Sequence, residues 1–328
     1  MPIFGGELKS VSEIFANVRG QKKKIKSVWA NQDGLPFKVY ELFAGRFVTV
    51  GEGNKSNYSS NAKTWKAMSG IGNYVYRGIT YGNGKFVAVG SNGAVFYSSD
   101  GETWNQGSGL SASQFYSVAY GNGRFVTVGV SGKSYYSLDG INWTSMSGLS
   151  TASFYRGVTY GNGRFVTVGQ AGRSYYSTNG TSWTSMSGLS SSQEYYAVAY
   201  GNGRFVATGA NGAYYSTNGT SWTQMSGLKS GVLYMGVTYG DGKFVTVGQS
   251  GTSYYSTNGT SWTQTSGLDT TAAYYFSVTY GNGVFVAVGS SGKSNYSLDG
   301  INWISMSGLN AITYYAVCFS IDGGYQNT

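Results

Sequence analysis

Hydrophobic and polar residues alternate along most of this chain in short runs that end at glycine-rich turns. Such alternation is typical of strands with one buried face, and Gly or Asn at the breaks tolerates the positive φ of tight turns. In the clearest unit a Gly-Asn-Gly turn joins the first two runs and an Asn-Gly turn joins the last two. The four runs are residues 155–160, 164–169, 174–177 and 183–186. They predict four antiparallel strands in about forty residues.

The unit occurs seven times, and each copy carries a tryptophan just after its second turn. The copies read Tyr-Ser-x-Asn/Asp-Gly-x-x-Trp, except that Ala62 replaces the glycine of the first. The Asn or Asp side chains are candidates for catalysis or sugar binding. Because the same turn recurs whatever surrounds it, a structural role is favoured, with the side chain accepting hydrogen bonds from the turn's own amides. The structural tryptophans lie 39 to 41 residues apart: Trp65, Trp104, Trp143, Trp183, Trp222, Trp262 and Trp303.

Seven such units predict an all-β fold, a seven-bladed β-propeller of four-stranded antiparallel blades. After the last unit comes a surplus first strand at 314–319, which matches 195–200 almost residue for residue. The first unit has good second, third and fourth strands, but its own candidate first strand at 37–42 matches poorly. We therefore expect a propeller over residues 37–328 that is closed by the strand at 314–319, since closure removes open sheet edges.

Residues 1–36 lie outside the repeat and are expected to form a small N-terminal β segment for attachment. Residues 10–18 and 24–30 are predicted to be two short strands joined by the basic segment 19–24. A basic run can hold nucleic acid, but it is more often a solvated loop, and we expect no nucleic acid partner. A hairpin of this size is marginal alone, so it is expected to pack on a partner protein or on a second copy of the chain.

Composition excludes several kinds of chemistry. The chain of 328 residues has no His and one Cys, Cys318, so an intrachain disulfide, a cysteine metal site and a histidine-dependent triad are excluded. We expect neither a metal nor a cofactor. No apolar run approaches the roughly 18 residues of a membrane helix, so no membrane insertion is expected. The net charge of +9 favours acidic partners such as anionic wall polymers and acidic glycans.

A sialidase-like glycosidase is the least favoured function. Such an enzyme needs an arginine triad, a Tyr–Glu nucleophile pair and an acid/base aspartate. Arg77, Arg156 and Arg173 offer a partial triad. Several of the few acidic residues lie in turns, however, and no two stand out as the carboxylate pair of a glycosidase. The sequence therefore predicts a protein without catalytic residues.

Variation among the repeats concentrates on one face of the predicted disk. Because strands alternate in direction, the Gly-Asn-Gly turns and the Asn/Asp-Gly turns share one face, which repeats nearly unchanged. The loops between second and third strands and the loops between blades share the other face, and these differ from unit to unit. Variation on one face of a rigid scaffold indicates a recognition surface, although relaxed drift also produces it.

The candidate ligand-binding residues come from this variable face. An aromatic residue near the start of each first strand recurs in all seven units, which favours packing around the central channel over a repeated sugar platform. The residue after it varies, and one position of the second-to-third loops carries Lys or Arg in four units. Aromatic groups beside basic ones suit sugars that bear phosphate or carboxylate. The candidates are Lys133, Tyr155, Arg156, Arg173, Tyr195, Arg77, Tyr116 and Lys293.

Two resemblances to known families rest on these motifs. The boxes, such as Ser98-Ser-Asp-Gly-Glu-Thr-Trp104, resemble the Asp-box (bacterial neuraminidase) repeats of β-propellers over about residues 45–319, with one residue fewer between Ser and Trp. That resemblance implies the fold alone, because such boxes occur in sialidases and lectins alike. Residues 10–43, with Lys24-Ile-Lys-Ser-Val-Trp-Ala-Asn-Gln-Asp-Gly34, are similar to the attachment regions of bacteriophage and prophage tail proteins. Units such as 81–90 resemble propellers at the tips of phage tails from Gram-positive hosts.

The phage resemblance implies a virion tail protein that is made in the host cytoplasm and acts outside the cell. It would be a non-catalytic receptor-binding protein that recognises bacterial surface carbohydrate or an anionic wall polymer through the variable face. Residues 1–36 would dock on a tail or baseplate protein. The alternatives are a structural tail or baseplate propeller without its own ligand, and a secreted lectin.

Overall fold

The computed structural model of the chain describes residues 14–18, 21–25, 28–32, 35–39, 45–271 and 274–320. These residues form strands and turns, and none of them lies in an α-helix. The prediction of an all-β fold is confirmed. Four short 3-10 turns follow the second strands of their blades: η1 (Ser91–Gly93), η2 (Val130–Gly132), η3 (Gln170–Gly172) and η4 (Ser290–Gly292).

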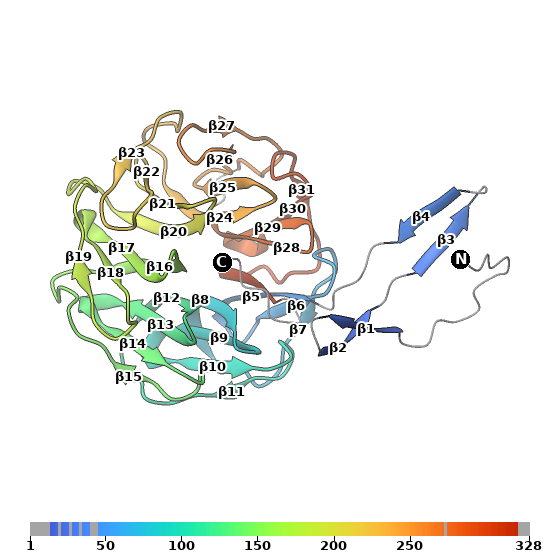
Figure 1. Cartoon of the computed structure of the whole chain (residues 1–328), viewed down its shortest axis with the longest axis horizontal. Helices are drawn as coiled ribbons and strands as arrows, with labels where there is room; N and C mark the ends of the chain where they lie inside the picture. Colours follow the sequence, from blue (N-terminus) through green and yellow to red (C-terminus); the bar gives the residue numbers. More distant parts are fainter. Residues whose placement is uncertain are drawn as a thin grey trace.

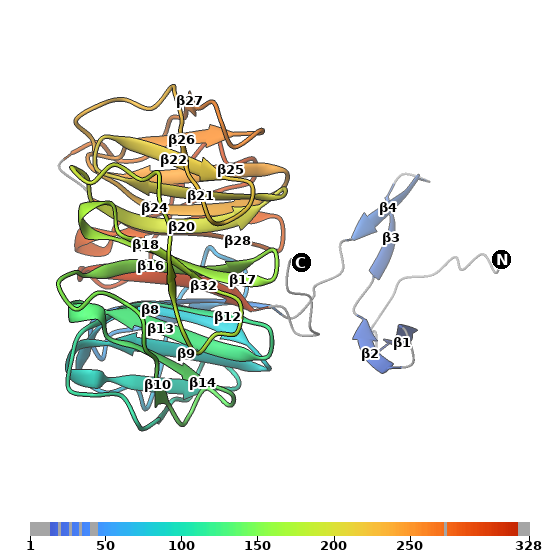
Figure 2. The same ribbon diagram turned by 60° about the vertical axis from the view of Figure 1, so that its left-hand side comes forward.

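Seven four-stranded antiparallel blades form a closed ring, which Figure 1 shows face-on and Figure 2 from the side. The predicted seven-bladed propeller is thus confirmed. From the innermost strand outwards, the first three blades are β32 (Tyr314–Ser320), β5 (Arg46–Gly53), β6 (Asn57–Ser59) and β7 (Lys66–Ala67); β8 (Tyr74–Gly82), β9 (Lys85–Gly90), β10 (Val95–Ser98) and β11 (Asn105–Gln106); and β12 (Phe115–Gly121), β13 (Arg124–Gly129), β14 (Ser134–Ser137) and β15 (Thr144–Ser145).

The remaining four blades repeat the same order. They are β16 (Tyr155–Gly161), β17 (Arg164–Gly169), β18 (Ser174–Ser177) and β19 (Thr184–Ser185); β20 (Tyr195–Gly201), β21 (Arg204–Gly209), β22 (Gly212–Ser216) and β23 (Thr223–Gln224); β24 (Tyr234–Gly240), β25 (Lys243–Gly248), β26 (Ser253–Ser256) and β27 (Thr263–Gln264); and β28 (Tyr275–Gly281), β29 (Val284–Gly289), β30 (Ser294–Ser297) and β31 (Ile304–Ser305).

The first blade takes its innermost strand from the far end of the chain. β32 pairs antiparallel with β5, in a register that runs from Tyr314 opposite Gly51 to Ser320 opposite Arg46. β5 also makes two pairs with β8 at its far end, which joins the first two blades into one eight-stranded sheet. The ring of blades is therefore closed by hydrogen bonds between segments more than 260 residues apart in sequence.

The N-terminal region holds two hairpins rather than the single hairpin that the sequence predicts. β1 (Ile14–Val18) pairs with β2 (Gln21–Ile25), and β3 (Val28–Gln32) pairs with β4 (Leu35–Val39). Most of the basic segment 19–24, expected to be a connecting loop, therefore lies in strand β2. Residues 37–39, which the repeat placed at the start of the propeller, belong to β4.

The hydrophobic core lies between neighbouring blades. Val126 and Val128 of the third blade pack in one cluster with Tyr155, Phe165 and Trp183 of the fourth. The second strand of each blade is buried over most of its length, because other blades or strands cover both of its faces. The seven box tryptophans are 4% to 9% exposed, so they fill the spaces between blades as large apolar groups.

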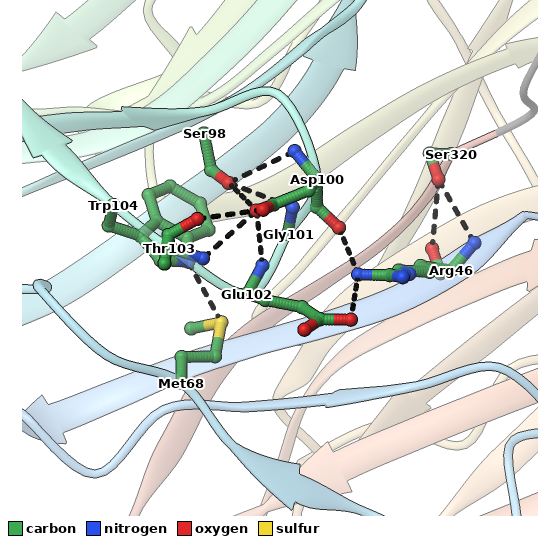
Figure 3. Close-up of polar contacts among 9 residues, drawn as sticks. All are labelled: Arg46, Met68, Ser98, Asp100, Gly101, Glu102, Thr103, Trp104 and Ser320. Atoms are coloured by element: carbon green, nitrogen blue, oxygen red, sulfur yellow. Dashed lines mark hydrogen bonds and ion pairs between the residues drawn. The ribbon is translucent and has the colours of Figure 1, made fainter.

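Each box turn, which we define as the Ser-x-Asn/Asp-Gly-x-x-Trp segment, closes on its own polar side chains (Figure 3). The Asp100 carboxylate accepts hydrogen bonds from the amides of Glu102 and Thr103 at 2.8 and 2.9 Å, and the Ser98 hydroxyl accepts one from Gly101 at 2.8 Å. Partial burial opposes ionisation of Asp100, but the hydrogen bonds from Thr103, Glu102 and Ser98 outweigh it and hold the pKa of this carboxyl well below its usual range. Asn179 accepts the same two amide hydrogen bonds, so the structural role of these side chains is borne out.

The two kinds of turn use positive φ differently. In the Gly-Asn-Gly turns both Asn and the following Gly take positive φ, for example 45° at Asn162 and 74° at Gly163. In the box turns only the glycine does so, and Asn179 does not, contrary to the expectation for an Asn-Gly dipeptide. Ala62 takes φ of 62° at the glycine position of the first box. Both kinds of turn lie on one face of the disk, which we call the turn face.

Candidate binding site at the channel mouth

The innermost strands of the seven blades surround a central channel (Figure 1). Side chains from corresponding positions form three levels along it. The middle level is an aliphatic ring: Ile79, Val118, Val158, Val198, Val237, Val278 and Val317. On the side of the variable loops, opposite the turn face, the channel widens into a cavity of about 200 Å³.

One large side chain from each blade lines this cavity, and we call these seven residues the girdle. They are Arg77, Tyr116, Arg156, Tyr196, Met235, Phe276 and Tyr315. The aliphatic ring repeats Val or Ile in every blade, whereas the girdle position holds four different residue types. The girdle position therefore varies in size and charge, unlike the aliphatic ring below it.

Each girdle residue is the extra residue of a β-bulge. In the fourth blade Tyr155 is opposite Gly169 and Gly157 is opposite Val168, so Arg156 between them has no partner on β17. The same register shift occurs in all seven blades. A bulge turns a side chain away from the direction that strict alternation would give it. Here it lets the aromatic residue face the core while the next residue faces the channel.

Arginine and tyrosine alternate over five of the seven girdle residues, from Tyr315 round to Tyr196. The Arg77 guanidinium carbon lies 4.3 Å from the centre of the Tyr315 ring and 5.8 Å from that of Tyr116. The Arg156 guanidinium carbon lies 5.2 Å from the Tyr116 ring centre and 5.4 Å from that of Tyr196. Cation–π contacts of this kind hold both arginines in place at the mouth.

The remaining two girdle residues, Met235 and Phe276, are apolar. The Phe276 and Tyr315 rings lie 5.1 Å apart, and Phe276 is stacked on Tyr274 with ring centres 6.0 Å apart. Met235 lies between this aromatic group and Tyr196 in the order of the blades. The cavity therefore has a cationic, hydrogen-bonding side and an apolar side.

Two carboxylates stand at the mouth beside the girdle. Glu194 lies 3.5 Å from the Arg156 guanidinium, and Glu52 accepts a hydrogen bond from the Tyr315 hydroxyl at 3.3 Å. Burial, reinforced by the charge of Glu194, raises the pKa of Tyr196. Burial also raises the pKa of Tyr315, against the opposing charge of Arg77. Both tyrosines are therefore neutral phenols near neutral pH, and Tyr315 donates its proton to Glu52.

The structure brings together only some of the residues that the sequence proposed for binding. Arg77, Tyr116 and Arg156 line the cavity, as expected for a site on the variable face. Tyr155 and Tyr195 are fully buried between blades, with their hydroxyls bonded to the backbone at Ser150 and Ser190. They cannot offer ring faces to a sugar. They also do not line the channel, so the predicted packing around the channel is corrected to packing between blades.

The basic residues of the second-to-third loops stand apart from this cavity. Lys133 and Arg173 are exposed, each directly after a 3-10 turn, and neither lines the cavity. Lys293 forms an ion pair with Asp269, and the hydrogen bond from Lys293 holds the pKa of the Asp269 carboxyl well below its usual range. These three residues lie on the same face of the disk but do not contribute to the girdle.

Four girdle residues were not among the sequence candidates, and neither were the two glutamates. Tyr196, Met235, Phe276 and Tyr315 all follow the recurring aromatic residue, so their position in the repeat was a usable signal. Glu194 directly precedes Tyr195, and Glu52 follows the last residue of β5 that pairs with β32. Only the closure of the ring brings Glu52 next to Tyr315.

The opposite end of the channel is nearly invariant. A second cavity of about 310 Å³ opens there, lined by Tyr81, Tyr120, Tyr160, Tyr200 and Tyr239. In the part of the chain that the structure describes, no three His, Cys, Asp or Glu side chains gather in a way that would hold a metal ion. Nor does this part contain a helix with the length and apolar character to cross a membrane.

Comparison with known proteins supports the fold. No protein-family model and no curated protein matches the sequence. Among solved structures, YCF48 from Cyanidioschyzon merolae is similar with a TM-score of 0.56 and 17% identity, over 73% of this chain and 87% of that one. A structure of YCF48 bound to D1 peptide is similar with a TM-score of 0.55 and 16% identity, over 73% and 83% of the two chains.

An enzyme shares the architecture as well. Virginiamycin B lyase from Staphylococcus aureus is similar with a TM-score of 0.61 and 14% identity, over 70% of this chain and 83% of that one. Identities this low show a common fold and nothing about activity. The chain is therefore a β-propeller of four-stranded blades, similar in architecture to the YCF48 and virginiamycin B lyase propellers.

Proposed function

We propose that this protein is a non-catalytic receptor-binding protein of a phage or phage-derived tail, and that its girdle binds carbohydrate or wall polymer on a bacterial surface. The observation that carries the proposal is the girdle itself. Seven bulges aim seven large side chains into one cavity, and this position varies in size and charge among the blades, whereas the next two positions of each strand carry only small residues and Val or Ile.

The chemistry of the girdle suits sugars. Tyr116, Tyr196 and Phe276 provide flat apolar surfaces for the faces of sugar rings, and Arg77 and Arg156 provide forks of N–H donors for hydroxyl, carboxylate or phosphate oxygens. The tyrosine–arginine contacts fix these groups before a ligand arrives, which lowers the entropic cost of binding.

The absence of catalysis is part of the proposal and rests on the state of the mouth's acidic groups. Glu194 is engaged by Arg156 and Glu52 by Tyr315, and the tyrosines beside them have raised pKa values. A Tyr–Glu pair alone does not make a glycosidase of this kind, which also needs an acid/base carboxylate, and no Asp or Glu of the described residues lines the cavity. This arrangement favours a binding site over a hydrolytic one.

Attachment to a tail or baseplate protein is assigned to the N-terminal hairpins. β1–β2 and β3–β4 are two separate two-stranded sheets, which are marginal by themselves. A partner that adds strands or covers their faces would stabilise them. The resemblance of residues 10–43 to tail attachment regions supports this role.

The test is adsorption of the purified protein to a panel of bacterial cells. We expect a double variant, Arg77→Ala with Arg156→Ala, to lose adsorption to the strains that wild type binds. The matched control is Arg164→Ala with Arg204→Ala on the turn face. Arg164 and Arg204 also stack on tyrosines, at 5.4 and 5.8 Å, so the control loses two similar contacts without touching the girdle. Equal loss of adsorption in both double variants would contradict the proposal.

A further inference from the structure

The girdle cavity is a pit with a complete wall, and its shape limits what can enter. Side chains from all seven blades surround it, and the aliphatic ring lies between it and the cavity at the other end of the channel. Members of that ring are only 5% to 9% exposed. A groove has two open ends and can hold an inner stretch of a polymer. A walled pit is entered along its axis, so a chain that fills it must end there.

The volume of the pit indicates how much of a ligand it holds. About 200 Å³ is below the range of about 300–1,000 Å³ that is usual for sites that enclose drug-sized ligands. One sugar or polyol unit with its charged substituent is the size that fits. Further units of a polymer would lie outside the pit.

The charges of the pit select an anion on one side. The guanidinium carbons of Arg77 and Arg156 lie 5.8 and 5.2 Å from the centre of the Tyr116 ring, so both positive charges are on the same side of the pit. Arg156 forms an ion pair with Glu194. Arg77 forms no ion pair within 4.0 Å among residues 45–271 and 274–320. Arg77 is therefore the stronger anchor for an incoming anion. A guanidinium fork matches the paired oxygens of phosphate and carboxylate alike.

From this geometry we propose that the girdle recognises the end of an anionic polymer chain and not its inner repeats. One terminal unit enters the pit, with its phosphate or carboxylate against Arg77 and Arg156 and its less polar face towards Phe276 and Met235. This inference rests on the proposed function and narrows its ligand. Its distinctive consequence is that each polymer chain binds one protein for each recognised end, whatever the chain length.

Calorimetric titration of the full chain tests this with probes of defined length. Oligomers of glycerol phosphate supply the phosphate arm, oligogalacturonates supply the carboxylate arm, and maltooligosaccharides are the neutral control. We expect one anionic series to bind at one protein per chain at every length, at least tenfold more tightly than the neutral series. The series that binds identifies the anionic group.

Variants locate the binding. Arg77→Ala is expected to weaken binding at least tenfold, and Arg77→Lys to recover only part of it, because the ammonium keeps the charge but lacks the fork. Arg164→Ala on the turn face is expected to bind as wild type does. Urea denaturation of each variant verifies that the fold is intact.

The outcomes separate this inference from the proposed function. If the number of proteins bound per chain increases with oligomer length, the girdle recognises inner units, so chain-end recognition is wrong while surface binding stands. If neither anionic series binds more tightly than the neutral one, or if nothing binds, the anionic chain end is refuted. Adsorption to cells in the girdle variants then decides separately whether the proposed function survives.

Discussion

Replacing Tyr314 with alanine tests whether the last described strand holds the ring closed. The Tyr314 ring is fully buried in the cluster that contains Phe47 and Trp65 of the first blade and Val286 of the seventh. Its hydroxyl donates to the Asn57 side chain at 2.7 Å and accepts from the Asn310 amide at 3.2 Å. Closure thus depends on both packing and hydrogen bonds at this residue.

The size of the effect follows from these contacts. Truncating a buried aromatic residue to alanine costs about 3 to 5 kcal/mol. Leaving the buried Asn57 oxygen without its donor adds about 1 to 3 kcal/mol. Because folded domains are stable by only about 5 to 15 kcal/mol, Tyr314→Ala should leave a marginal protein. Tyr314→Phe keeps the ring but leaves the Asn57 oxygen without its donor, so it should cost about 1 to 3 kcal/mol.

The assay is urea denaturation followed by tryptophan fluorescence, since each blade carries a buried tryptophan. The matched control is Tyr195→Ala in the internal strand β20, where the ring is equally buried. We expect the two alanine variants to lose similar stability, and truncation after Asn310, which removes all of β32, to leave an insoluble or much less stable protein. Closure by β32 would be refuted if Tyr314→Ala unfolded at the same urea concentration as wild type while Tyr195→Ala unfolded at a much lower one.

Further predictions concern the box turns, the spacing of the blades, the attachment segment and the ligand. Partial burial opposes ionisation of Asp139, but hydrogen bonds from Asn142 and Ile141 hold the pKa of its carboxyl below the value in the unfolded chain. The carboxylate therefore contributes fully to stability above about pH 5, and this contribution is lost as the pH falls below about 4. Asp139→Asn should therefore flatten the acid side of the stability profile, as urea midpoints at several pH values will show; an unchanged profile would contradict it. A Cβ at Gly161 would lie 2.1 Å from the Tyr200 ring, so Gly161→Ala should lower the free energy of unfolding by about 1 to 3 kcal/mol. The loss should be much smaller in a protein that also carries Tyr200→Ala. Equal losses with and without Tyr200→Ala would show that the ring is not the cause. A chain that starts at residue 40 should fold and adsorb to cells but fail to join a tail or an oligomer in sedimentation; an unfolded ring would refute this boundary. Adsorption should weaken as salt rises, because girdle arginines meet an anion; salt-independent adsorption would argue for a neutral ligand.

The repeat made the architecture predictable from the sequence. Seven box turns and a surplus strand fix the number of blades, and strand alternation assigns the variable loops to one face. The structure explains why Tyr155 and Tyr195 were wrong candidates for ligand binding. Strict alternation cannot show which of two neighbouring residues faces the channel when one of them is the extra residue of a bulge.

Other features depend on distances around the ring that no local pattern contains. Lys133 and Arg173 share a face with the girdle, but their loops follow second strands and not the innermost ones. Glu52 reaches Tyr315 only because β32 returns to β5. The second N-terminal hairpin escaped prediction because the propeller was expected to begin at residue 37, within its strand β4.

The most direct test of the central claim is to find which face of the disk touches the bacterial surface. A photoreactive amino acid can be placed at Met235 in the girdle or, as the matched control, at Asn162 in a Gly-Asn-Gly turn on the turn face. After adsorption to cells and illumination, the account predicts that bacterial surface carbohydrate or wall polymer is attached to the protein labelled at 235 and not to the one labelled at 162. Attachment from 162 alone would contradict it.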